Sequence, residues 1–128
     1  MIRKIICAAA MMLWASSVWA LDADALKNAD IPADGTKAQK EVCAAAMSAA
    51  YFSFVQNPNP DLSEQELAQI ETYAFSWTSY AAVANGMDME TYFEQRLKGD
   101  IVQLQALGAE RWAAYAAQCF ERSAQVAP

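Results

Sequence analysis

The apolar segment VCAAAMSAAYFSFV, residues 42–55, decides the fold of this chain. It carries no charged side chain, and Ser48 and Ser53 are its most polar members. At 100° per residue, apolar side chains fall on both faces of the helix that this segment predicts. A helix that is apolar nearly all round is typical of a protein interior. Because a helix needs about 20 apolar residues to cross a bilayer, we expect this segment to form the core of a helical domain instead.

The first 20 residues have the layout of a secretory signal peptide. The basic residues Arg3 and Lys4 precede an apolar run over residues 5–14, and Ala20 provides the small side chain needed at a cleavage point. The apolar run is short for an N-terminal membrane anchor, which is the alternative interpretation. We therefore expect a periplasmic or secreted protein of a bacterial envelope that keeps no stable membrane anchor once residues 1–20 are removed.

The rest of the chain is expected to form one all-α domain. Residues 21–35 include helix-breaking residues and predict a partly ordered N-terminal arm, which leaves residues 36–128 as a single helical domain. Short connections at Gly86 and Gly108 favour antiparallel neighbours, so the expected fold is a small four-helix bundle. The apolar periodicity predicts helices at about residues 36–56, 63–84, 88–107 and 109–124.

Capping sequences mark the starts of the first two helices. Thr36 and Gln39 can form a capping box, and Ser63 with Glu66 is the clearest such pair in the chain. In the third helix the apolar stripe keeps α-helical spacing across Gly99. Because glycine costs about 1 kcal/mol relative to alanine inside a helix, we expect one continuous helix that is locally less stable at Gly99.

The cysteines agree with an exported protein. Cys7 belongs to the signal peptide, so Cys43 and Cys119 remain as an even pair in an oxidising compartment. Each lies on a stripe expected to be buried, one in the first helix and one in the last. We therefore expect a disulfide between them, with a pair of buried free thiols as the alternative.

The composition excludes several classes of function. All 15 acidic residues follow position 20, whereas Arg3 and Lys4 precede it, so the processed chain carries a net charge of −8. Such a surface repels nucleic acid and anionic membranes. The chain has no histidine, and it contains no glycine-rich phosphate loop, no C-x-x-C pair and no nucleophile-elbow sequence. We therefore expect a protein that is not an enzyme and that binds neither a cofactor nor a metal ion.

Paired carboxylates are the one catalytic device that the sequence offers. Glu90 and Glu94 stand four residues apart, as a shared site on one helix face would require. Acid–base catalysis also requires one carboxyl group to be desolvated. Acidic residues near a helix start are stabilised by the helix dipole, which accounts for Glu90 without any function. A carboxylate-dependent hydrolase is therefore the least favoured interpretation.

The aromatic residues on the helix stripes allow a cavity for a ligand as one further function. Trp77, Phe93, Trp112 and Phe120 lie on the helix stripes and are expected in the core. A cavity between the helices that carries a small apolar ligand is the alternative.

Phe75 lies far from the stripe of its helix, beside Glu71, with Tyr80 at the opposite margin. An exposed aromatic residue with a carboxylate rim is typical of a contact surface. The sequence therefore predicts a binding protein that recognises a protein partner, possibly a basic one, as inhibitors, immunity proteins and chaperone-like proteins do. The residues expected on the partner surface are Phe75, Glu71, Tyr80, Glu90 and Glu94.

Overall fold

The computed structural model describes residues 31–124, and every regular element in this range is helical. The elements are α3 (Lys37–Gln56), α4 (Glu64–Ala84), α5 (Met89–Tyr92), the π-helical turn η2 (Phe93–Leu97), α6 (Lys98–Ala106) and α7 (Ala109–Ser123). Because α5, η2 and α6 follow one another without a break, the described chain forms four helices, as expected, and contains no strand. The expected signal peptide and most of the expected N-terminal arm lie outside the described residues.

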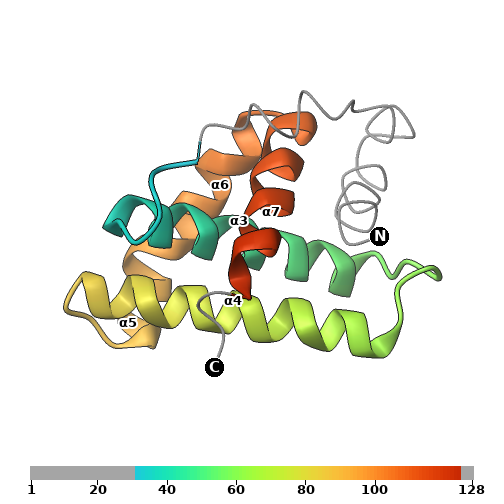
Figure 1. The fold of residues 1–128 in the computed structure, drawn as a ribbon, viewed down its shortest axis with the longest axis horizontal. Helices are drawn as coiled ribbons and strands as arrows, with labels where there is room; N and C mark the ends of the chain where they lie inside the picture. The colour runs from blue at the N-terminus through green and yellow to red at the C-terminus, as the bar shows by residue number, and fades with distance from the viewer. Residues whose placement is uncertain (1–30, 125–128) are drawn as a thin grey trace.

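The helix α3 is the centre of the arrangement. Figure 1 shows α3 and α4 lying side by side and running antiparallel, and α3 also contacts α6 and α7. Within residues 31–124, no helix combines the length and the apolar character that a membrane crossing requires.

The core surrounds α3. Every residue from 43 to 50 is buried, which confirms that this helix has neighbours on more than one side. Trp77 of α4 and Trp112 of α7 are each only 1% exposed. The indole N–H of Trp77 donates a hydrogen bond to the Ser123 hydroxyl at 2.8 Å, and that hydroxyl donates to the carbonyl of Cys119 at 2.6 Å. The polar atom of this buried indole is therefore satisfied, as buried polar groups must be.

A disulfide joins the first and last described helices. Cys43 of α3 and Cys119 of α7 are bonded, with their Cα atoms 5.4 Å apart. Both residues are fully buried, so the bond lies inside the core. The expected covalent link between the two helices is confirmed.

The helix starts agree with the sequence in one case and differ in detail in the other. At α4, the Ser63 hydroxyl accepts from the Glu66 amide at 3.0 Å and the Glu66 carboxylate accepts from the Ser63 amide at 3.2 Å, which is a complete capping box. At α3, the Thr36 hydroxyl accepts from the Gln39 amide at 3.1 Å, as expected. The Gln39 side chain, however, accepts from the Gly35 amide at 2.8 Å, so it satisfies the amide one residue earlier than a capping box does.

The third helix contains an irregularity that the apolar pattern did not predict. Gly99 lies inside the regular helix α6, and the helix departs from α geometry at η2, where the Lys98 amide donates to the Phe93 carbonyl five residues earlier. Tyr92 and Leu97, also five residues apart, are both buried. In a regular α-helix, a step of four residues would place Arg96 next to Tyr92 on the buried side. The wider turn places Leu97 there instead and leaves Arg96 at the surface.

Candidate functional site

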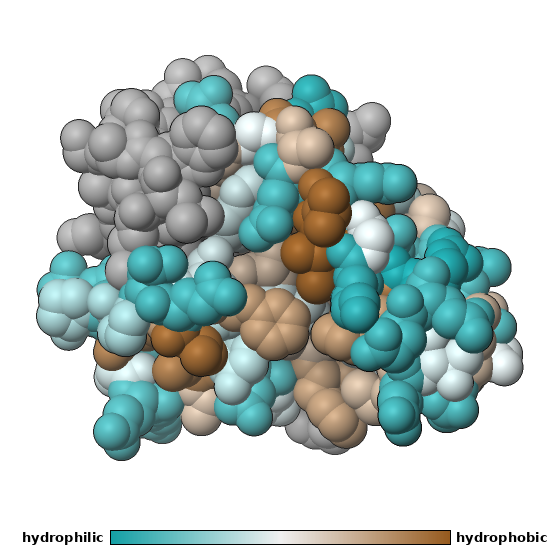
Figure 2. Space-filling view, turned by 180° about the vertical axis from the view of Figure 1, so that it is seen from behind, coloured by the Kyte–Doolittle hydropathy of each residue, from teal (hydrophilic) through white to brown (hydrophobic). Residues whose placement is uncertain are grey.

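Seven large apolar side chains of the described range are at least 40% exposed, which is where a contact surface can lie. Figure 2 shows apolar residues gathered near the middle of one face, between hydrophilic regions. The exposed apolar residues are Phe52, Val55, Phe75, Tyr80, Val83, Val102 and Leu107.

Two of these residues, Phe52 and Phe75, line a hollow between α3, α4 and the α5–η2 segment. We call this hollow of about 340 Å³ the Phe75 groove. Its wall is mainly apolar and aromatic. The lining residues are Ser48, Tyr51, Phe52, Glu71, Ala74, Phe75, Thr78, Met89, Glu90, Phe93 and Leu97.

Aromatic rings from two helices form much of this wall. Tyr51 and Phe52 of α3 have ring centroids 5.7 Å apart, and Phe75 comes from α4. Phe75 is 62% exposed and Phe52 is 40% exposed, which confirms that Phe75 lies at the surface. Phe93, which the stripe predicts in the core, is only partly buried and lines the groove instead. Rigid aromatic side chains held in this way can bury apolar area against a partner at a low cost in side-chain entropy.

Two carboxylates give the groove a negative rim. Glu71 of α4 and Glu90 of α5 are both exposed and line it. No basic side chain within residues 31–124 forms an ion pair with either of them. Burial and then the neighbouring Glu71 carboxylate, which accepts a hydrogen bond from the phenol, raise the pKa of Tyr51. The Glu71 carboxylate therefore lies close to the Tyr51 phenol at the groove.

The structure brings together three of the five residues predicted for a partner surface. Phe75, Glu71 and Glu90 line the same groove, whereas Tyr80 and Glu94 do not. Glu94 pairs with Lys98 at 2.9 Å, within the same helical segment. Only Glu90 of the proposed Glu90–Glu94 pair faces the groove, and the two carboxylates share no hollow.

The contribution of α3 to the groove was missed. Tyr51 and Phe52 stand in an apolar segment in which every position is a candidate for the core. The signal that could have found them is the bulk of the two adjacent rings at the end of an alanine-rich helix, because such rings need more space than the closely packed part of α3 allows.

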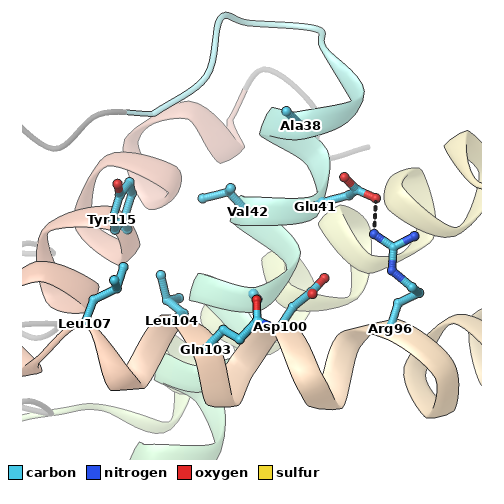
Figure 3. A pocket seen from close by; sticks show the side chains of 10 residues that line it. Ala38, Glu41, Val42, Arg96, Asp100, Gln103, Leu104, Leu107 and Tyr115 are labelled. Carbon is cyan, nitrogen blue, oxygen red and sulfur yellow. Dashed lines mark hydrogen bonds and ion pairs between the residues drawn. The ribbon is translucent and has the colours of Figure 1, made fainter.

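A second hollow, of about 370 Å³, lies between α3, the η2–α6 segment and α7. Figure 3 shows its side chains, with charged groups of Glu41, Arg96 and Asp100 on one side and the apolar Leu104 and Leu107 on the other. We call it the Glu41 pocket, and the sequence analysis did not predict it. Its lining residues are Ala38, Glu41, Val42, Ala45, Arg96, Asp100, Gln103, Leu104, Leu107 and Tyr115.

Hydrogen bonds fix the charged end of this pocket. The Arg96 guanidinium donates to the Glu41 carboxylate at 3.0 Å and to the side-chain carbonyl of Asn85 at 3.1 Å. The Asn85 amide group in turn donates to the same Glu41 carboxylate oxygen at 3.1 Å and to the carbonyl of Ala81 at 2.8 Å. The three side chains form a closed network between α3, the end of α4 and η2.

No group of three or more cysteine, aspartate or glutamate residues within residues 31–124 is arranged to hold a metal ion.

No protein-family model matches the chain, and no curated protein or solved structure matches it either.

Proposed function

We propose that this chain is an exported binding protein that recognises a protein partner through the Phe75 groove. The observation that carries the proposal is an exposed aromatic residue at the edge of an apolar groove with a negative rim. The partner that fits is a segment that inserts an apolar side chain into the groove and places lysine or arginine opposite Glu71 and Glu90.

The area at Phe75 is sufficient for a binding anchor. A phenylalanine buries about 150–250 Å² in a core, so a side chain that is 62% exposed leaves on the order of 120 Å² for a partner to cover. At about 25 cal/mol per Å², covering this area contributes roughly 3 kcal/mol, which is in the range of an interface hot spot. A groove of about 340 Å³ is at the small end for ligand pockets, so it accepts one or two side chains.

Charge and location support the same proposal. With its expected signal peptide removed, the chain carries 7 basic and 15 acidic residues, which favours approach of a basic partner. The absence of histidine from the whole sequence, together with the disulfide that uses Cys43 and Cys119, leaves little chemistry for a catalytic role. Periplasmic or secreted location follows from the expected signal peptide.

Site-specific photo-crosslinking in the producing cell tests the proposal. A photoreactive phenylalanine analogue replaces Phe75, and the matched control carries it at Val83, which lies on the same helix, is 74% exposed and does not line the groove. We expect one discrete crosslinked protein from position 75, none from position 83, and less product as salt is raised. Equal labelling from the two positions would show that position 75 is an ordinary surface site.

A small apolar ligand is the second candidate occupant, because most of the groove wall is apolar. Native mass spectrometry of the protein isolated from its envelope separates the two candidates. A bound small-molecule mass that is lost in Phe75→Ser supports a ligand carrier, and an unmodified mass together with a protein crosslink supports the partner.

A further inference from the structure

The Glu41 pocket has a charged end and an apolar end, and it is separate from the Phe75 groove (Figure 3). Val42 from α3, Leu104 and Leu107 from α6 and its C-terminal end, and Tyr115 from α7 form the apolar end. Its volume of about 370 Å³ lies within the range of small-molecule sites, about 300–1,000 Å³.

The charged end carries a surplus negative charge. Glu41 and Arg96 neutralise each other across 3.0 Å. Asp100 also lines the pocket, and it has no ion-pair partner among the described residues. Burial raises the pKa of Asp100 more than the nearby Arg96 lowers it, and the Glu41 charge raises it further.

A buried hydroxyl directly before η2, that of Tyr92, has no partner among the described residues. Tyr92 is completely buried, and its hydroxyl makes no hydrogen bond within residues 31–124. Desolvation, followed by the charges of Asp100 and Glu41, raises the pKa of Tyr92 to about 12. Unpartnered buried hydroxyls are rare because they cost free energy, so this one marks the start of the η2 segment as locally unfavourable.

Local backbone geometry supports the same location. The π-helical turn η2 ends at Leu97, which is buried. Arg96, one residue earlier, points to another side and donates a hydrogen bond to Glu41. Such turns are frequent at functional sites. Here the turn allows Leu97 to pack in the core while Arg96 and Asp100 face the pocket.

We propose that the Glu41 pocket binds a small primary alkylammonium ion, with its charged group at Asp100 and its apolar chain against Leu104, Leu107 and Tyr115. One positive charge matches the surplus of one negative charge, and an alkyl chain matches the apolar end. This site is independent of the partner surface at the Phe75 groove.

Isothermal titration with n-hexylamine tests the proposal on the disulfide-bonded protein isolated from its producing cell. Hexanol and hexanoate serve as neutral and anionic ligands of the same chain length. We expect hexylamine to bind at least tenfold more tightly than either of them. Blocked lysine, with acetylated and amidated ends, is expected to bind at least tenfold more weakly than hexylamine, because its polar amides would lie against the apolar end.

Two variants locate the site. Asp100→Asn is expected to weaken hexylamine binding at least tenfold, whereas Glu110→Gln, an equal change of charge at an exposed position outside the pocket, leaves it unchanged. Leu107→Ala, at a half-exposed lining position, is expected to weaken binding threefold or more, and it serves as the test if Asp100→Asn does not fold.

No binding of hexylamine, equal binding of hexylamine and hexanol, or binding that neither Asp100→Asn nor Leu107→Ala changes would overturn the proposal. Equal binding of hexylamine and blocked lysine, whose side chain also ends in a primary ammonium, would assign the pocket to a peptide lysine and overturn the proposal of a small free alkylammonium ion.

Discussion

Replacing Tyr92 by phenylalanine should stabilise the protein. The Tyr92 hydroxyl is completely buried and makes no hydrogen bond within residues 31–124. A buried polar group without a partner costs about 1–3 kcal/mol. The void left by one oxygen atom, at about 24 cal/mol per Å³, offsets only about 0.3 kcal/mol of the gain. We therefore expect Tyr92→Phe to raise the free energy of unfolding by about 1 kcal/mol or more.

Urea unfolding followed by the fluorescence of Trp77 and Trp112 measures this change. With a urea dependence of about 1–3 kcal/mol per molar, a gain of about 1 kcal/mol moves the midpoint up by about 0.3–1 M. Tyr73→Phe is the control, because the Tyr73 hydroxyl accepts a hydrogen bond from Gln69 at an exposed position, so its loss should change stability by less than about 0.5 kcal/mol. A Tyr92→Phe protein that is less stable than the parent by about 1 kcal/mol would refute the reasoning, since the hydroxyl would then have a partner.

Three further predictions concern stability. Replacing Cys43 and Cys119 by alanine opens a loop with a sequence separation of 76 residues, so urea unfolding should show a loss of about 2–4.5 kcal/mol, and a loss below about 1 kcal/mol would contradict the role of the disulfide. Ser63→Ala removes the acceptor of the α4 capping box and should lower the free energy of unfolding by about 1 kcal/mol, which an unchanged Tm would exclude. The raised pKa of Tyr92, about 12, means that the fold favours the neutral phenol, so this contribution is complete below pH 10 and is lost as the pH rises through about 12. The parent should therefore lose about 2 kcal/mol more than Tyr92→Phe between pH 9 and 12, and parallel pH profiles would contradict the assignment.

Local signals were sufficient for much of the fold. The capping box at Ser63 and Glu66 depends on residues three positions apart, and the structure has α4 begin there. The disulfide was predictable because the two remaining cysteines, Cys43 and Cys119, both lie on stripes that must face one core. The exposure of Phe75 follows in the same way, from its position off the stripe of a single helix.

The π-helical turn could not be read from the same patterns. The third helix has apolar residues at both α-helical and wider spacing, and only the burial of Tyr92 together with Leu97 selects the wider turn. Gly99 suggested a weak point on propensity alone, but α6 remains regular through it because packing outweighs a cost of about 1 kcal/mol.

Both hollows also depend on how helices are placed relative to one another. The Phe75 groove needs Phe52 of α3 beside Phe75 of α4, and the Glu41 pocket needs Glu41 and Arg96 to meet across 55 positions of sequence. No periodicity within one helix contains this information, because it concerns faces of different helices.

The affinity of the protein that crosslinks at position 75 tests the central claim most directly. Its dissociation constant should be compared for the parent, for Phe75→Ser and for Val83→Ser, a more exposed position of the same helix outside the groove. We predict that Phe75→Ser weakens binding at least 30-fold, about 2 kcal/mol, and that Val83→Ser changes it less than threefold. Equal affinities of all three proteins would contradict the assignment of the Phe75 groove as the binding site.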